Sequence, residues 1–130
     1  MNADAALDAA CQEWRRLAET EGEAIRTLNW TLVATCQATL TDLQTRLTQL
    51  HATAKAEWAR LGNASQARES ALKSTVADLI KLEQCNLAQL AGARLALQND
   101  LDALDQSSQN LKRIQRSYTT THPAVWNTYS

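Results

Sequence analysis

The chain has few residues that interrupt helices and few that build catalytic centres. Its 130 residues include three Gly, one Pro, two His and no Phe, whereas Ala and Leu dominate. So few turn-forming residues exclude a loop-rich or β-rich fold. Three scattered glycines also could not build a Gly-rich phosphate-binding loop. We therefore expect an all-α protein whose length suits a single domain.

An excess of charge of one sign is also absent. Thirteen Lys and Arg against 14 Asp and Glu give a net charge of -1. Nucleic-acid-binding proteins usually concentrate basic residues on one face, so we expect no nucleic-acid partner. No apolar stretch approaches the roughly 18 residues of a membrane span, so we expect no membrane insertion. The first residues carry acids where a signal peptide is basic and then apolar, and we therefore expect a cytoplasmic protein.

The residues that could hold a metal or a nucleophile are few and far apart. Cys11, Cys36 and Cys85 form no C-x-x-C pair, which argues against a disulfide framework and a structural zinc site. We interpret these cysteines as small hydrophobic residues on or beside apolar stripes, with a regulatory thiol as the alternative. His51 and His122 lie on different expected elements. We therefore expect no metal, no cofactor and no enzymatic activity.

Apolar residues recur at three- and four-residue steps in two helical stretches, at about residues 5–26 and 30–61. The stripe of the first comprises Leu7, Cys11, Trp14, Leu17 or Ala18, Glu21 and Ile25. The stripe of the second comprises Val33, Cys36, Leu40, Leu43, Leu47, Leu50, Ala54, Trp58 and Leu61. Asn29 is the expected N-cap of the second helix. Gly62 is expected to take the left-handed conformation that ends it.

The third helix is expected to be the longest, from about residue 65 to residue 118, with Ser65 or Ser70 as its cap. Its stripe comprises Leu72, Val76, Leu79, Leu82, Leu87, Leu90, Arg94, Leu97, Leu101, Leu104, Ser108, Leu111, Ile114 and Tyr118. At about 1.5 Å per residue it would reach about 75 Å, and the second helix can cover little more than half of that. Its first half then packs antiparallel on the second helix. The second half of the third helix then needs the first helix, another chain or a ligand to cover its apolar stripe.

These features predict an elongated antiparallel three-helix bundle over residues 1–118 and a short irregular aromatic tail over residues 119–130. The tail either folds back onto the bundle or awaits a partner.

Polar and small residues also fall on the expected stripes. Asn86 lies on the inner face of the third helix, where we interpret it as fixing the register of packing. Gly22 is either a tolerated defect or a site of close helix packing, and packing is the default interpretation of Gly92. Glu21 and Glu83 approach the apolar stripes, and each is expected to meet an arginine, for which the candidates are Arg16, Arg46 and Arg94.

Three segments share an order that is found in a known family. Residues 17–25 carry an E-x-x-A-I pattern that ends at Ile25 and is followed by Asn29 and Trp30. Residues 79–86 carry an L-x-x-L-x-x-x-N pattern, and residues 111–118 form an amphipathic ending that closes with a Tyr. In this order the segments resemble FlgN-type flagellar export chaperones, over about residues 14–118.

The resemblance implies a cytoplasmic chaperone that binds the C-terminal helical segments of flagellar hook-associated proteins and delivers them to the type III export machinery. A cargo helix would lay its own apolar stripe along the second half of the third helix. The expected partner-binding residues are Leu97, Leu101, Leu104, Leu111, Ile114, Tyr118 and Trp126. The alternative is a non-catalytic structural bundle or coiled-coil subunit without a client, in which these residues pack on the first helix or across a homodimer.

Overall fold

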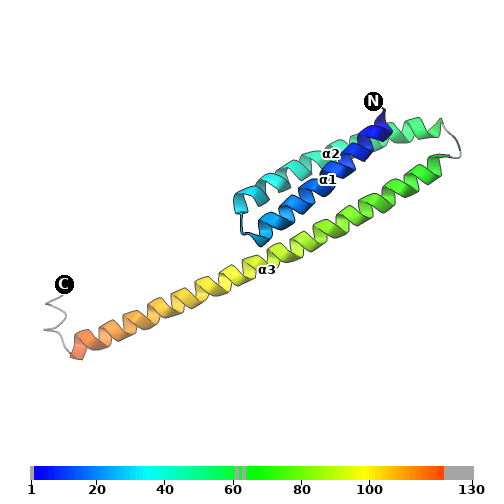
Figure 1. The fold of residues 1–130 in the computed structure, drawn as a ribbon. Coiled ribbons are helices and arrows are strands. Elements are labelled where there is room, and N and C mark those ends of the chain that lie inside the picture. Colours follow the sequence, from blue (N-terminus) through cyan, green and yellow to red (C-terminus); the bar gives the residue numbers. More distant parts are fainter. Residues whose placement is uncertain (1, 61, 63, 122–130) are drawn as a thin grey trace. The chain divides into compact units, whose positions relative to one another are not determined.

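The computed structural model describes residues 2–60, 62 and 64–121. They form three helices and no strand: α1 (Ala3–Arg26), α2 (Trp30–Ala59) and α3 (Ala64–Thr121) (Figure 1). The expected all-α three-helix class is therefore confirmed. The expected helix ends lie within three residues of the observed ones, and α3 continues past the expected end at residue 118. Leu61 and the aromatic tail from residue 122 onward, which includes Trp126, lie outside the described residues.

The chain divides into two compact units, Met1–Ala91 and Gly92–Ser130. We call them the N-terminal unit and the C-terminal unit. The N-terminal unit contains α1, α2 and the first part of α3, and the C-terminal unit contains the remainder of α3.

Side-chain caps and residues with positive φ define the helix ends in the N-terminal unit. The Asn2 side chain accepts a hydrogen bond from the Ala5 N–H at 2.8 Å, which caps α1. Asn29 caps α2 as expected, because its side chain accepts from the Leu32 N–H at 3.2 Å. Leu28 has a φ of 58°, so the chain reverses within a few residues and α1 and α2 run antiparallel. Gly62 has a φ of 66°, which confirms its expected conformation after α2.

All three helices contribute to the core of the N-terminal unit. The expected stripe residues of α1 are all buried, as are the described ones of α2 apart from Leu50, which is partly buried against the core. From α3, Leu79 is 0% exposed in this core, and Leu72, Val76 and Leu82 pack against it partly buried. Burying a Leu side chain of this kind stabilises the fold by about 1.5 to 3 kcal/mol. The three helices are therefore held together by one apolar cluster.

One residue of the expected α3 stripe is misplaced. Leu87 is 57% exposed, whereas its neighbour Asn86 is buried, together with Leu90. The inward face of α3 therefore passes through Leu79, Asn86 and Leu90. The expectation for Leu87 was wrong because a polar side chain occupies the core position beside it.

Candidate functional site

The C-terminal unit carries a row of exposed apolar side chains on α3. Exposure ranges from 38% at Leu97 to 67% at Leu104. We call this set the C-terminal stripe; its members are Leu97, Leu101, Leu104, Leu111, Ile114 and Tyr118. They are the partner-binding residues expected from the sequence, apart from Trp126. The structure brings all six onto one formed helix.

Local side-chain contacts support the helix beneath this stripe. Gln98 donates to Asp102 at 3.0 Å, and Gln109 donates to Asp105 at 3.3 Å. Both pairs are four residues apart, the spacing at which side chains meet on a helix surface. Such pairs contribute only about 0.2 to 0.5 kcal/mol each. Most of the stability of a helix comes instead from packing an apolar face, so the C-terminal stripe is the part that gains most from a partner.

The spacing of the stripe is that of a coiled coil. Leu97, Leu104, Leu111 and Tyr118 follow one another at seven-residue intervals, and Leu101 lies between the first two. A 3.5-residue period of this kind keeps one face of a helix against a partner helix in a left-handed supercoil. Leu90 occupies the same heptad position one repeat earlier, and it is buried in the N-terminal unit. The pattern of a core face thus continues into residues whose side chains are exposed.

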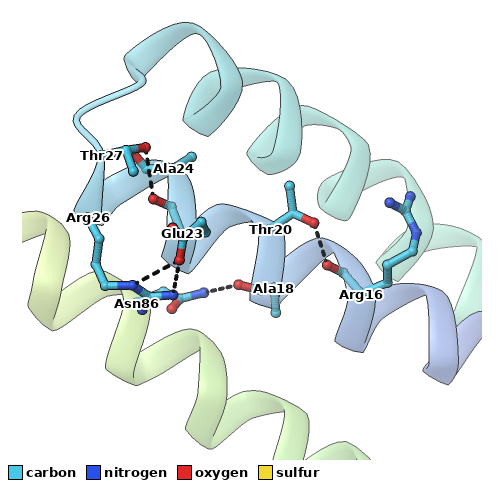
Figure 2. Close-up of polar contacts among 8 residues, drawn as sticks. All are labelled: Arg16, Ala18, Thr20, Glu23, Ala24, Arg26, Thr27 and Asn86. Carbon is cyan, nitrogen blue, oxygen red and sulfur yellow. Dashed lines mark hydrogen bonds and ion pairs between the residues drawn. The ribbon is translucent and has the colours of Figure 1, made fainter.

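A second distinctive feature is a buried polar cluster between α1 and α3. The Asn86 side-chain N–H donates to the Ala18 carbonyl at 2.7 Å (Figure 2). It also donates to the Glu21 carboxylate at 3.0 Å. A Cβ added at Gly22 would lie 2.9 Å from Asn86 Oδ1, so the two helices approach closely here because position 22 has no side chain. Of the two interpretations of Gly22, close packing is the one that fits.

Glu83 completes this cluster from α3. Burial raises the pKa of its carboxyl to about 7, and the neighbouring charge of Glu21 and a hydrogen bond with it act in the same direction. No ion pair among the described residues joins either glutamate to an arginine. The expected arginine partners were therefore wrong. Arg16 pairs with Glu13 on its own helix instead.

An apolar groove of about 520 Å³ opens beside this cluster. Trp14 of α1, Leu47 of α2 and Ile80 of α3 contribute to its walls, and among the described residues that line it Glu83 is the only charged one. The buried Trp14 Nε1 and Glu83 Oε1 have no hydrogen-bond partner among the described residues. No sequence pattern predicts this groove, since its walls come from three helices whose relative rotation depends on tertiary packing.

The remaining chemically reactive side chains are dispersed. Cys11 and Cys36 are buried, and burial raises the pKa of both thiols. Cys85 is exposed, so the interpretation as a small buried hydrophobe does not hold for it. His51 Nε2 lies 3.0 Å from both carboxylate oxygens of Glu69. This contact joins α2 to α3, and the hydrogen bond with His51 lowers the pKa of the Glu69 carboxyl. Among the described residues, no group of three or more His, Cys, Asp or Glu could hold a metal ion.

No helix in the described part of the chain has both the length and the apolar character needed to cross a bilayer. Comparison of the chain with protein-family models, with curated proteins and with solved structures finds no match in any of the three.

Proposed function

We propose that the protein is a cytoplasmic chaperone that binds the C-terminal helical segments of flagellar hook-associated proteins before their type III export. Six large apolar side chains exposed on one face of a formed helix carry this proposal. Contiguous apolar surface of this kind typically marks a site of protein interaction. The resemblance of residues 14–118 to FlgN-type chaperones supplies the identity of the cargo and of the export machinery to which it is delivered.

The binding mode follows from the spacing of the C-terminal stripe. An amphipathic cargo helix can place its own residues at i, i+3, i+4 and i+7 along this face. Covering the exposed part of each stripe residue contributes about 1 to 2 kcal/mol. Association and the ordering of a disordered segment oppose this gain by several kcal/mol. The expected affinity is therefore micromolar at the strongest, which still permits release of the cargo.

The N-terminal unit has a core of its own, to which the C-terminal stripe does not contribute. Its core is completed by α1, α2 and the first part of α3, with Leu79 and Trp58 among its fully buried side chains. Among the described residues, no member of the C-terminal stripe belongs to this core. The stripe can therefore remain available to cargo in a protein that is already folded.

Calorimetric titration tests the proposal directly. The full chain is titrated with C-terminal segments of hook-associated proteins, and a scrambled segment of the same composition serves as the control. We expect saturable binding with a negative heat-capacity change, because apolar surface is buried on binding. If every segment behaves like the scrambled control, the chaperone proposal is wrong.

A non-catalytic coiled-coil or bundle subunit without a client is the second candidate. One observation favours it: the apolar residues of the C-terminal stripe are arranged symmetrically along the chain, with acids on one side of the centre and bases on the other. This candidate predicts an oligomer that persists on dilution and no binding of any cargo segment.

A further inference from the structure

The C-terminal stripe is symmetric about a point between Ser107 and Ser108. Three apolar residues precede a polar segment at residues 105–110, and three follow it. Each residue of the first group has a counterpart at the same number of residues beyond the centre: Leu104 with Leu111, Leu101 with Ile114, and Leu97 with Tyr118. All six side chains are exposed.

The charges on either side of this centre are opposite in sign. The first side carries Asp100, Asp102 and Asp105, and residues 95–111 contain no Lys or Arg. The second side carries Lys112, Arg113 and Arg116, and residues 106–121 contain no acid. A helix face with this arrangement is complementary to a copy of itself turned end to end, which is the property of an interface built on a two-fold axis.

We infer that the C-terminal stripe pairs with that of a second copy of this chain in an antiparallel coiled coil, with the two-fold axis between Ser107 and Ser108. Each apolar residue then lies beside its counterpart on the other copy, and each such pair occurs twice. The two serines at the axis are small, so the helices can approach closely there. Polar residues between the apolar positions of a coiled coil, such as Ser108 here, fix the register of such a pair.

The edges of the stripe select the antiparallel orientation. Asp105 and Lys112 are seven residues apart and therefore lie along the same edge, whereas Asp100 lies along the opposite edge. In an antiparallel pair like edges face each other, so Asp105 of one copy faces Lys112 of the other, twice. In a parallel pair unlike edges meet, and Asp100 would face Asp105 of the other copy. Because edge charges set the orientation of coiled coils, the antiparallel pair is favoured.

This pairing is independent of the proposed function, since it needs no cargo. If both hold, a second copy and a cargo helix compete for the same stripe. The self-paired form then covers the apolar face while no cargo is present.

Charge reversal of the full chain tests the pairing by sedimentation equilibrium. Asp105→Lys and Lys112→Asp each replace two attractive contacts by two repulsive ones, and each alone should raise the dimer Kd by on the order of tenfold. An equimolar mixture of the two variants should recover the wild-type affinity, because attractive pairs form again. Asp102→Lys is the matched control, since it makes the same charge change away from the stripe and should have a smaller effect.

Circular dichroism verifies that each variant keeps its helical content. A wild-type chain that stays monomeric up to about 100 μM, an affinity in the class of weak encounters, would overturn the inference. So would single reversals that change the dimer Kd no more than Asp102→Lys does.

A distance measurement between the two copies tests the orientation. A spin label is attached at Gln98→Cys in a Cys85→Ser background, since Cys11 and Cys36 are buried. The antiparallel pair places the two labels about 30 Å apart along the axis, from the rise per residue of a helix. A parallel pair would place them within about 15 Å, close to the interaxial distance of packed helices plus the two linkers. The short distance, or the absence of any intermolecular distance, would contradict the antiparallel dimer.

Discussion

The two parts of α3 carry the same residue types at similar spacing, but their apolar side chains are buried in one part and exposed in the other. Leu79 in the N-terminal unit is 0% exposed, whereas Leu104 in the C-terminal unit is 67% exposed. In the N-terminal unit, α1 and α2 supply the apolar surface that covers the helix. In the C-terminal unit the same kind of stripe is displayed. An apolar period therefore predicts which face of a helix seeks burial, and it leaves open what buries that face.

The largest expected difference lies in the cost of truncating a leucine. Leu79→Ala should lower the free energy of unfolding by about 3 kcal/mol, because it removes buried methyl groups and leaves a cavity. Leu104→Ala is the matched control and should stay within about 0.5 kcal/mol of the wild type, as expected for an exposed position. Urea unfolding at low protein concentration, followed by circular dichroism, measures both. Equal losses for the two variants would mean that residue 104 belongs to a core.

Introducing charge into the C-terminal stripe should break its interactions and spare the fold. Replacing Leu104 and Leu111 with Asp together should weaken binding of cargo segments at least about 100-fold, since two apolar contacts are lost and two charges are desolvated. Helical content should remain nearly unchanged. Calorimetry and circular dichroism measure these two quantities.

Leu95→Asp is the control for this double variant. Leu95 is 62% exposed and lies on the side of α3 away from the stripe by helical periodicity. It should leave binding intact. Unfolding of the double variant, or an equal loss of binding with Leu95→Asp, would show that the stripe is not the binding face.

Two glycines should respond to Ala in opposite directions. Gly22→Ala should destabilise the protein by about 1 kcal/mol, because its Cβ would displace the buried Asn86 amide and weaken that side chain's hydrogen bonds. Gly92→Ala should stabilise by about 0.5 to 1 kcal/mol, because a Cβ there meets no atom within 4 Å in the described part of the chain and Ala favours a helix. Thermal unfolding of the two variants measures both signs. A destabilising Gly92→Ala would restore the packing interpretation of that residue.

The smallest expected effect is a pH dependence of the free energy of unfolding, which comes from Glu83 in the N-terminal unit. The raised pKa of Glu83, about 7 when folded against 4.5 in an unfolded chain, means that the unfolded state loses its proton first as the pH rises. Glu83 therefore contributes a loss of stability between pH 4.5 and about pH 7, and the loss is complete above that. Glu83 is only partly buried, so solvent screening limits the effect to about 1 kcal/mol.

Glu83→Gln should remove this loss and raise the melting temperature at pH 8 more than at pH 5. The exposed Glu19→Gln is the control and should change the two melting temperatures alike. A variant at position 83 that shifts both temperatures equally would contradict the assigned role of its carboxyl.

Much of the fold could be predicted from the sequence. The stripes of α1 and α2, the N-cap at Asn29 and the left-handed Gly62 follow from periodicity and local backbone preferences, which act within a few residues. Asn86 and Leu87 were both assigned to the inner face, but adjacent residues of a helix point about 100° apart and only Asn86 is buried. The expected arginine partners of Glu21 and Glu83 were also wrong. Which side chains meet across two helices depends on the rotation of each helix, which the sequence pattern does not determine.

The residues of the candidate site could be predicted from the sequence, but whether their side chains are buried or exposed could not. The period that places Leu97 and Leu104 on one face is the same period that places Leu79 and Leu90 in a core. Exposure of the first pair became apparent only with the tertiary structure. The groove beside Trp14 and Glu83 had no signal in the sequence, because its walls come from all three helices.

Amide hydrogen exchange along α3 tests most directly whether the C-terminal stripe is an interaction surface. Exchange is measured in the diluted full chain, in the concentrated chain, and with a saturating cargo segment. Residues 65–91 should be protected throughout, whereas residues 97–118 should exchange rapidly in the diluted chain and become protected when a second copy or cargo covers the stripe. Strong protection of residues 97–118 at every dilution, unchanged by any added segment, would contradict this account.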